Sequence, residues 1–591
     1  MRKLLYSVLS GLFFYGWVVH AETDLNLTSH EKTPFCDPLL KLESQIKAPA
    51  FWGIQLIGAD FTKTSLRSFH LNPVSVVVSD QAISEGASRK ILLSNHEKSS
   101  DFKLLLKTGI GQKFSTLLGD QPLIKEIKNF AIETLPIFNR FMFSSNLKIH
   151  GKHVAGTIGA QGFNFGVSNI AEIEELDIFH GMDGADNESM IEGYQTLIDR
   201  NEPVPVLNMS HALSADVKIV ELLKTLVQKK QTICVIASHN QGEELRKENL
   251  INQLDDCIIV GSLGFDGIKS DFSNYGPVVG LIAPGEAIVS LGDQFEWHKE
   301  KLSALSGTSM AAPEVSGAAA NLKGLLPLSR AEDIRKILYE TAIDIGLPGR
   351  DAFTGYGVLN VLKATRVAEN LVKKGLTSAD EIHAALADPK IFNLDDLSRK
   401  ALSQAYQAGA SSPIYLNLRR KAALLSGKAE DFLELGTAYM AAGYSAFGRG
   451  MFIMAVNRKE AKIDKKNLSE IASHLASVQE KILKDERKNS YVIGSLANAD
   501  LLMEVYRKLS FESARLTYKT MKAQMNVVAP ERLAELEQRF PQKLYEIEEL
   551  DLAATLKMGD LFDPNLRKLD WKNPYEVTPF LPFAHPLKPL K

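Results

Sequence analysis

The sequence is poor in cysteine and carries no strong charge of either sign. Its 591 residues include three cysteines, and 68 basic residues against 71 acidic ones give a formal net charge of -3. So few cysteines exclude a disulfide framework, and the balanced charge excludes the basic surface typical of nucleic-acid-binding proteins. Cys234 and Cys257 lie in apolar, strand-like runs, which favours buried free thiols and leaves one disulfide bond open as the alternative.

Long apolar runs are missing beyond the N-terminus. Residues 1–21 combine a basic start, an apolar run and a small residue at Ala21, which predicts a signal peptide and export. A retained membrane anchor is the alternative, but the apolar run is short and polar chain follows it. We expect a mature chain without a transmembrane segment that is periplasmic, attached to the cell surface or secreted.

Residues 51–365 alternate short β-rich runs with helical patterns. This order predicts an α/β domain with a parallel central sheet and helices on both faces. A helix is expected over 215–229, between two of the strands. The expected strands cover residues 74–79, 172–179, 204–209, 232–237, 257–262 and 281–283.

Strand signals almost vanish after residue 365, where Ala, Leu, Glu and Lys recur at helical spacing. This pattern predicts an all-α C-terminal domain, with a helix stop at Gly375 and a helix start at Thr377 or Ser378. The expected organisation is a signal peptide (1–21), an N-terminal segment (22–50), the α/β domain (51–376) with a helical insertion at about 84–145, the all-α domain (377–560) and a proline-rich tail (561–591).

One helix pair in the all-α domain has the residue spacing of a tetratricopeptide unit. The matching positions are Leu435, Gly436, Tyr439, Gly443, Gly448, Phe452 and Ala455. The closing proline and clean neighbouring copies are missing, so an ordinary helical bundle is the alternative. A degenerate repeat array would bind a protein partner or pack on the α/β domain.

A serine stands among small residues in "LSGTSMAAPEVSGAAA", residues 305–320. Gly307 permits a tight turn before Ser309, and Pro313 fits the first turn of a helix. Backbone N–H groups at a helix N-terminus favour a developing negative charge beside such a serine. A capping serine is the commoner role, so other residues must decide.

Three other stretches of the sequence carry polar residues that could act together with Ser309. In "KIHGKHVAGTIG", His150 opens a helix of small residues, and His153 on the same face makes a metal pair the alternative. Asp80 and Asn240 each follow an expected strand, at the edge where α/β proteins build their sites. The amide of Asn240 could donate a hydrogen bond to an oxyanion.

These residues, in this chain order, resemble the subtilisin-like serine peptidases, the subtilase family. The stretch "HGKHVAGT" is close to the family's "HGTHVAGT", "VLNMSHAL" is similar to "INMSLGG", and "SGTSMAAP" is its serine motif. The resemblance covers residues 51–365. It implies that Ser309 is the nucleophile and that His150 is the general base and acid. It further implies that Asp80 orients His150 and that Asn240 holds the oxyanion.

The resemblance implies a serine endopeptidase that acts on protein or peptide substrates and needs no cofactor, and the signal peptide predicts that it is exported. An edge formed by Ser210, His211 and Ala212 would pair with an extended peptide. A catalytically inactive scaffold, binding a protein partner through the helical domain, is the alternative. Calcium is the one ion left open, because an acidic loop offers oxygen ligands, although a solvated loop is the simpler reading. That loop contains Asp183, Asp186, Asn187 and Glu188.

The chain departs from the family at several places. Gln81 and Ala82 follow Asp80 where the family has Ser or Thr and then Gly, so Asp60 is the alternative partner of His150. His211 and His239 replace Leu and Gly, which adds bulk near the expected specificity pocket and predicts narrow cleavage. Glu314 stands where the family commonly carries histidine.

Overall fold

The structure is a computed structural model that describes residues 38–456, apart from residue 70 and a set of internal stretches. The predicted signal peptide, most of the predicted insertion at 84–145, and the chain beyond residue 456 lie outside the described residues. The stretches left out are 81–89, 93–148, 161–165, 179–186, 212–215, 246–248, 298–299, 346–348, 410–411 and 413.

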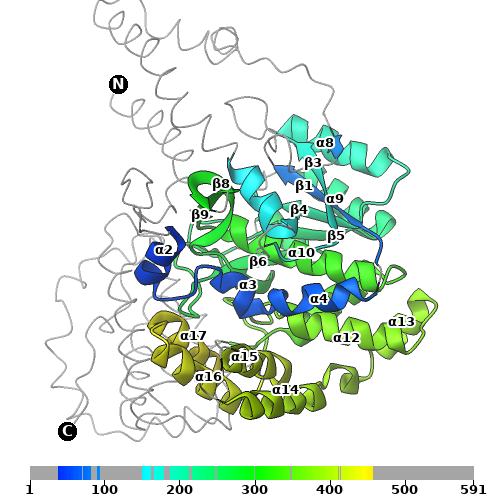
Figure 1. The fold of residues 1–591 in the computed structure, drawn as a ribbon. Coiled ribbons are helices and arrows are strands. Elements are labelled where there is room, and N and C mark those ends of the chain that lie inside the picture. The colour runs from blue at the N-terminus through cyan, green and yellow to red at the C-terminus, as the bar shows by residue number, and fades with distance from the viewer. Residues whose placement is uncertain are drawn as a thin grey trace, which may run out of the picture.

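A seven-stranded parallel sheet forms the centre, in the order β2-β3-β1-β4-β5-β6-β7 (Figure 1). Alternate residues of β1 face opposite sides of the sheet. Val76 and Val78 pack in the core under helix α10, whereas Val77 packs in the core under α8 and α9. The strands are β1 (Val74–Asp80), β2 (Lys90–Leu92), β3 (Ala171–Asp177), β4 (Val206–Met209), β5 (Ile233–Ala237), β6 (Ile258–Leu263) and β7 (Val279–Pro284).

Helices cover both faces of this sheet, as the sequence predicts. One face carries α8 (Asn187–Asp199) and α9 (Val217–Lys230), and the other carries α10 (Thr308–Leu325). The predicted α/β architecture is therefore confirmed, and each expected strand is present to within a few residues.

An antiparallel hairpin of β8 (Ile288–Trp297) and β9 (Glu300–Leu305) comes just before α10 and was not predicted. Its sequence, "SLGDQFEWHKEK", mixes charged residues with one glycine and has no apolar alternation along most of its length. The local pattern therefore indicates a loop, and pairing between the two strands overrides it.

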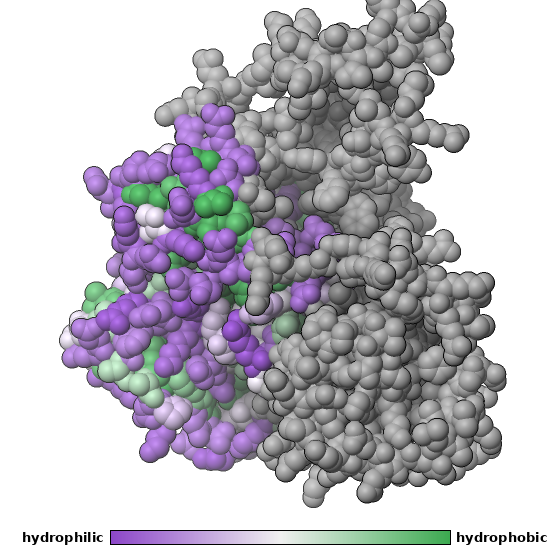
Figure 2. All heavy atoms as spheres, turned by 180° about the vertical axis from the view of Figure 1, so that it is seen from behind, coloured by the Kyte–Doolittle hydropathy of each residue, from purple (hydrophilic) through white to green (hydrophobic). Residues whose placement is uncertain are grey.

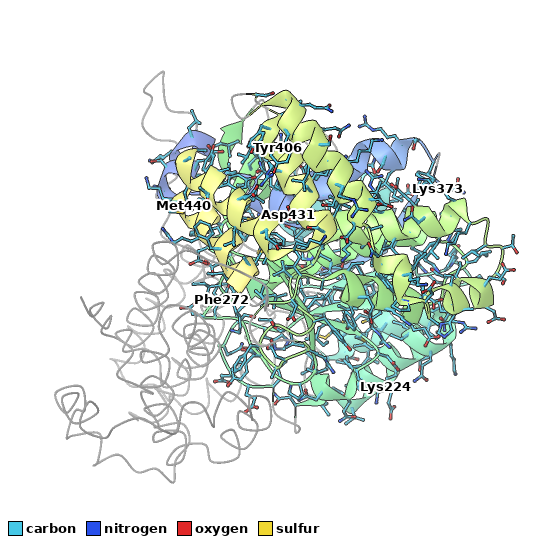
Figure 3. All side chains as sticks on the ribbon, turned by 90° about the horizontal axis from the view of Figure 1, so that it is seen from below. Lys224, Phe272, Lys373, Tyr406, Asp431 and Met440 are labelled. Atoms are coloured by element: carbon cyan, nitrogen blue, oxygen red, sulfur yellow. The ribbon has the colours of Figure 1, made fainter. Side chains whose placement is uncertain are left out.

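Helices fill the chain after α10: α11 (Ala331–Thr341), α12 (Val361–Lys373), α13 (Ala379–Ala385), α14 (Asp395–Ala408), α15 (Tyr415–Ser426), α16 (Ala429–Ala441) and α17 (Ser445–Val456). The predicted turn after α12 is present: Gly375 has a left-handed φ of 68°, and the Ser378 side chain caps α13 by accepting from Glu381 N. Figure 3 views these helices from below, with Tyr406 on α14 and Met440 on α16 labelled. The all-α character of 379–456 is confirmed.

Helices α16 and α17 approach each other closely because glycines lie at their crossing. A Cβ atom added to Gly436 would lie 2.7 Å from Phe452 Cε1, and one added to Gly448 would lie 2.5 Å from Met440 Cγ. Glycine, glycine and phenylalanine at these positions are part of the predicted tetratricopeptide pattern. The close helix pair agrees with that pattern, and membership of the repeat family stays a prediction.

Three short N-terminal helices lie between the sheet and the C-terminal helices: α2 (Pro38–Ile46), α3 (Trp52–Ile57) and α4 (Thr62–Arg67). Such short helices depend on tertiary packing, so the sequence pattern did not reveal them. Gly58, with a φ of 72°, packs against both α12 and α15, since an added Cβ would lie 2.8 Å from Leu362 Cβ of α12 and 2.8 Å from Leu424 Cδ1 of α15. One hydrophobic core therefore continues across the predicted boundary at 376/377, whose placement stays a prediction.

An ion pair with a buried arginine fixes this junction. Arg420 of α15 is almost fully buried and donates to Asp60 Oδ1 at 3.0 Å and to the Gln55 carbonyl at 2.6 Å. Its guanidinium also lies 4.2 Å from the ring centre of Phe61. Asn360, at the start of α12, adds a hydrogen bond of 2.8 Å to the Leu424 carbonyl.

The described surface is mostly hydrophilic in the view of Figure 2, with separate apolar patches. Within residues 38–456, no described helix has the length and apolar character needed to cross a membrane.

Replacing Arg420 with alanine should lower the free energy of unfolding by about 2 to 3 kcal/mol, because charged hydrogen bonds to Asp60 and Gln55 are lost in a buried site. Urea unfolding of the full chain measures this change. Arg399→Ala is the matched control, since its partner Asp396 and Arg399 itself are exposed, and its effect should stay within about 0.5 kcal/mol. Equal effects of the two changes would show that the junction adds no stability.

Candidate active site

Helix α10 begins at Thr308, so the expectation that Pro313 opens the helix is wrong. Pro313 lies inside the helix and has no N–H to donate to the carbonyl of Ser309, four residues earlier. Ser210, which follows β4, supplies the missing bond: its Oγ donates to Ser309 O at 3.0 Å. Because of the proline, the Ser309 carbonyl has no partner within the helix and is bound instead by Ser210 at the end of β4.

The Ser309 side chain is bound to the same residue. Its Oγ donates to the Ser210 carbonyl at 2.8 Å, and Ser309 as a whole is 7% exposed. Ser210 is held in turn by Asn208, whose Nδ2 donates to Ser210 Oγ at 3.0 Å and whose Oδ1 accepts from Ser316 Oγ at 2.8 Å. Two polar residues near the end of β4 therefore position the first turns of α10.

Asn240, which follows β5, caps the start of α10. Its Oδ1 accepts from Thr308 N at 2.8 Å and from Thr308 Oγ1 at 2.9 Å. These two bonds fix the orientation of the amide, and its donor atom, Nδ2, lies beside Gly307. Thr308 was not among the predicted site residues, although its place directly before Ser309 at a helix start could have revealed it.

The loop that carries Asn240 is itself fixed. Asn274 Oδ1 accepts from Gln241 N and Glu243 N, each at 3.0 Å. His239 adopts a left-handed φ of 73°, which is uncommon for a residue with a side chain. Burial, together with the neighbouring His211, lowers the pKa of His239 to about 4, so its ring is neutral at neutral pH.

The structure brings Asp80 and His150 together. Asp80 is the last residue of β1, and its Oδ1 lies 3.0 Å from His150 Nδ1 in helix 149–159. Burial disfavours the imidazolium form, but the Asp80 carboxylate outweighs it, so the pKa of His150 lies above its usual value of 6.5. His150 Nε2 is buried and has no hydrogen-bond partner among the described residues.

Asp60, the alternative partner of His150, lies elsewhere. It belongs to a short 3₁₀ helix, η1 (Ala59–Phe61), and its carboxylate binds Arg420. The structure thus places Asp80, and not Asp60, against His150.

The His150 and His153 rings bind different groups, which argues against a metal pair. His153 Nε2 donates to the Ile288 carbonyl of β8 at 2.8 Å, and burial lowers its pKa to about 3. Helix 149–159 can approach the hairpin this closely because of Gly156, where an added Cβ would lie 2.5 Å from Ser290 Oγ. His153 thus anchors the helix that carries His150.

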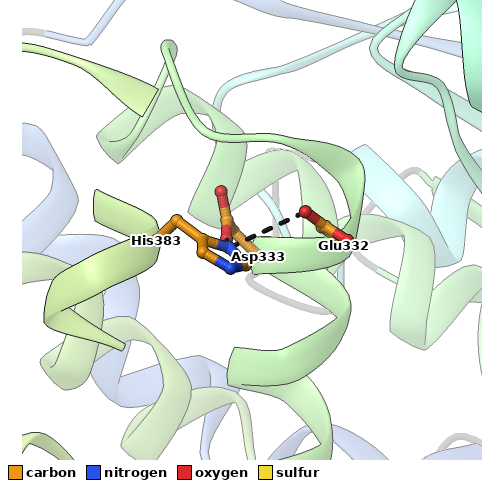
Figure 4. A group of neighbouring side chains, drawn as sticks. All are labelled: Glu332, Asp333 and His383. Carbon is orange, nitrogen blue, oxygen red and sulfur yellow. Dashed lines mark hydrogen bonds and ion pairs between the residues drawn. The ribbon is translucent and has the colours of Figure 1, made fainter. Parts of the chain in front are cut away.

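Among the described residues, the side chains that could share a metal ion are Glu332, Asp333 and His383 (Figure 4). Asp333 already has partners for both oxygens: Oδ1 lies 2.7 Å from His383 Nδ1, and Oδ2 accepts from Arg330 N at 2.9 Å. These bonds join α13 to the capped start of α11. In the acidic loop where calcium was left open, Asp183 and Asp186 lie outside the described residues, and Asn187 Nδ2 donates to Asp216.

The predicted substrate edge is only partly described. Ser210 lies beside Ser309, whereas Ala212 is outside the described residues. The ring of His211 is turned into the protein, with Nε2 3.1 Å from Ser79 Oγ and 3.3 Å from Tyr194 OH. Since His211 is 8% exposed, it adds little of the bulk expected near the specificity pocket.

Glu314 projects from α10 toward the N-terminal helices. It is fully buried, and neither carboxyl oxygen has a hydrogen-bond partner among the described residues. Burial raises the pKa of Glu314 well above its usual value, and Lys63 of α4 partly offsets that rise. Burial likewise lowers the pKa of Lys63 to about 8. The sequence marked Glu314 as unusual but did not indicate Lys63.

Part of the sequence is similar to a known protein family. Residues 142–357 match the model of the subtilase family, peptidase S8. This range is similar to a subtilase domain and holds His150, Asn240 and Ser309, while Asp80 precedes it.

Curated relatives of the subtilase domain are proteases. A thermostable alkaline protease of Halalkalibacterium halodurans is 29% identical over 37% of this chain and 58% of its own length. The major intracellular serine protease of Bacillus subtilis is 35% identical over 29% of this chain and 54% of its own length. The minor extracellular protease Epr of Bacillus subtilis is 25% identical over 46% of this chain and 40% of its own length. The chain thus spans about half the length of these relatives.

Solved structures give weaker similarity. A cold adapted subtilisin-like serine proteinase is 25% identical, with a TM-score of 0.29 over 36% of this chain and 72% of its own. The prenylagaramide maturation protease PagA is 19% identical, with a TM-score of 0.35 over 51% of this chain and 96% of its own. Both scores are too low to support a conclusion.

Glu314→Gln should become more stable relative to the native protein as the pH rises above about 4.5. The raised pKa means that folded Glu314 keeps its proton while the unfolded carboxyl loses it, so the native protein loses stability across this range. The glutamine has no such proton to lose. Urea unfolding at several pH values measures the difference, and a difference that does not change with pH would contradict the raised pKa.

Proposed function

We propose that the protein is a serine endopeptidase that cleaves protein or peptide substrates with Asp80, His150 and Ser309. The observation that carries this proposal is the 3.0 Å contact between Asp80 Oδ1 and His150 Nδ1, which leaves the buried Nε2 without a described partner. The subtilase domain and the protease names of its relatives support the same reaction.

In the proposed reaction, His150 Nε2 takes the proton of Ser309 as its Oγ attacks the substrate carbonyl, and then gives that proton to the leaving amine. Asp80 holds the ring in one orientation and stabilises the imidazolium, in line with the raised pKa of His150. Without substrate, Ser309 Oγ donates to the Ser210 carbonyl. Catalytic hydrogen bonds often form only in the substrate complex, so the hydroxyl would turn to His150 when the site is filled.

Asn240 is the proposed donor to the oxyanion, together with the backbone N–H of Ser309. The support is the pair of hydrogen bonds that Asn240 Oδ1 accepts from Thr308, which fix the orientation of the amide and of its donor atom, Nδ2. Donors fixed before the reaction stabilise the developing charge without reorganisation. Both donors stand at the start of α10, where the helix dipole has the same effect.

The stretch that follows β4, residues Ser210, His211 and Ala212, is the proposed edge for an extended peptide. A backbone carbonyl next to the nucleophile can accept from a substrate N–H in the manner of an added strand. A catalytically inactive scaffold is the alternative function, and the assembled Asp80–His150 pair argues against it.

Export is proposed from the signal-peptide pattern at 1–21, and one relative is named as extracellular while another is named as intracellular. The predicted all-α domain (377–560) is proposed as a site for a protein partner, from the tetratricopeptide spacing and the close α16–α17 pair. Neither property bears on the reaction at Ser309.

A fluorophosphonate probe should label the mature full-length protein at Ser309, because the probe reacts with an activated serine in the peptidase site. Peptide mapping by mass spectrometry locates the label. Ser309→Ala should abolish labelling, and Ser65→Ala on α4 is the control that should retain it. Absence of labelling in the folded native protein would count against catalysis and favour the scaffold.

Asp80→Asn should lower kcat by about four orders of magnitude, because the asparagine amide cannot stabilise the imidazolium of His150. The acidic limb of the pH–activity profile of this variant should also shift to lower pH, since the carboxylate that raises the pKa of His150 is gone. Asp60→Asn should change kcat only a few fold when both variants are measured folded. The opposite ranking would make Asp60 the partner of His150.

A further inference from the structure

A cluster of three polar side chains lies behind the candidate site, on the opposite face of the sheet. Ser79 Oγ lies 3.2 Å from Tyr194 OH and 3.1 Å from His211 Nε2, and the Tyr194 and His211 atoms are 3.3 Å apart. The three residues come from β1, from α8 and from the end of β4. Each is buried, with an exposed fraction of 0% for Ser79 and Tyr194.

The alternation of side chains along a strand explains why this cluster stands back to back with the site. On β1, Asp80 faces His150, so Ser79 must face the side of α8. After β4, Ser210 faces Ser309, so His211 faces α8 as well. Ser79 also pairs in register with Met209, two residues before His211. Every member on β1 or β4 is thus the chain neighbour of a residue in the proposed catalytic machinery.

Closed polar clusters of this kind fix backbone positions when every member is satisfied. Burial raises the pKa of Tyr194, so its hydroxyl keeps the proton that the cluster needs. We propose that Ser79, Tyr194 and His211 are positioning residues that lock the ends of β1 and β4 together and so hold the substrate edge at Ser210. This inference rests on the proposed peptidase function. None of the three is proposed to touch the reacting atoms.

The main test removes the Tyr194 hydroxyl, since Tyr194 belongs to neither strand. Tyr194→Phe should lower kcat/KM for an extended peptide about three- to tenfold, chiefly through a higher KM, because the hydroxyl contacts with Ser79 and His211 are lost. A single-residue ester, which does not reach along the edge, should change less than about twofold. Tyr444→Phe, in the turn between α16 and α17, is the matched control and should leave kcat/KM for both substrates unchanged.

His211 gives a second, independent comparison. His211→Leu keeps a side chain of similar size but loses Nε2, and should impair cleavage of the extended peptide at least as much as Tyr194→Phe. His211→Gln places an amide where Nε2 lies and should restore most of the native ratio between the two substrates.

Hydrogen exchange of the backbone at 206–211 supplies a measurement that does not need activity. Faster exchange in Tyr194→Phe, with the shift in substrate ratio, supports the proposal. Unchanged exchange, or equal losses for both substrates that merely follow a lower Tm, overturns it. If the native protein fails to react with the fluorophosphonate probe, the peptidase proposal fails, and exchange at 206–211 still decides whether the cluster holds this edge.

Discussion

The site depends on the hydrogen bonds that hold the start of α10 against the ends of β4 and β5. Asn240 caps Thr308 from one strand end, and Ser210 binds both the carbonyl and the hydroxyl of Ser309 from the other. A nucleophile on a helix start would otherwise share the fraying of helix termini. These bonds make the position of Ser309 a property of the sheet rather than of the helix alone.

Two ionisable groups in or beside α10, His150 and Glu314, have shifted pKa values. Asp80 supports the charged form of His150 on one side, while Glu314 on the other side is buried with only Lys63 to offset its desolvation. The first pair favours a charge that the proposed reaction creates. The second places a poorly compensated carboxyl between the nucleophile helix and the N-terminal helices, where it opposes stability.

Much of the α/β architecture could be predicted from the sequence, because buried parallel strands are short apolar runs and the motifs at their ends have distinct residues. The β8–β9 hairpin and the helices α2–α4 could not, since only tertiary pairing makes those segments regular. In the site, sequence order indicated Asp80, His150, Asn240 and Ser309. The contacts of Thr308, Ser79 and Tyr194 depend on which strand ends are neighbours, and no local pattern contains that information.

The ion pair between Asp60 and Arg420 joins residues that are 360 positions apart. During synthesis, the N-terminal helices emerge long before α15 exists to cover them. The junction can close only after the ribosome has made the whole subtilase domain and the first helices that follow it. The fold is therefore complete only after the first C-terminal helices have been made, although the residues proposed for catalysis all come earlier in the chain.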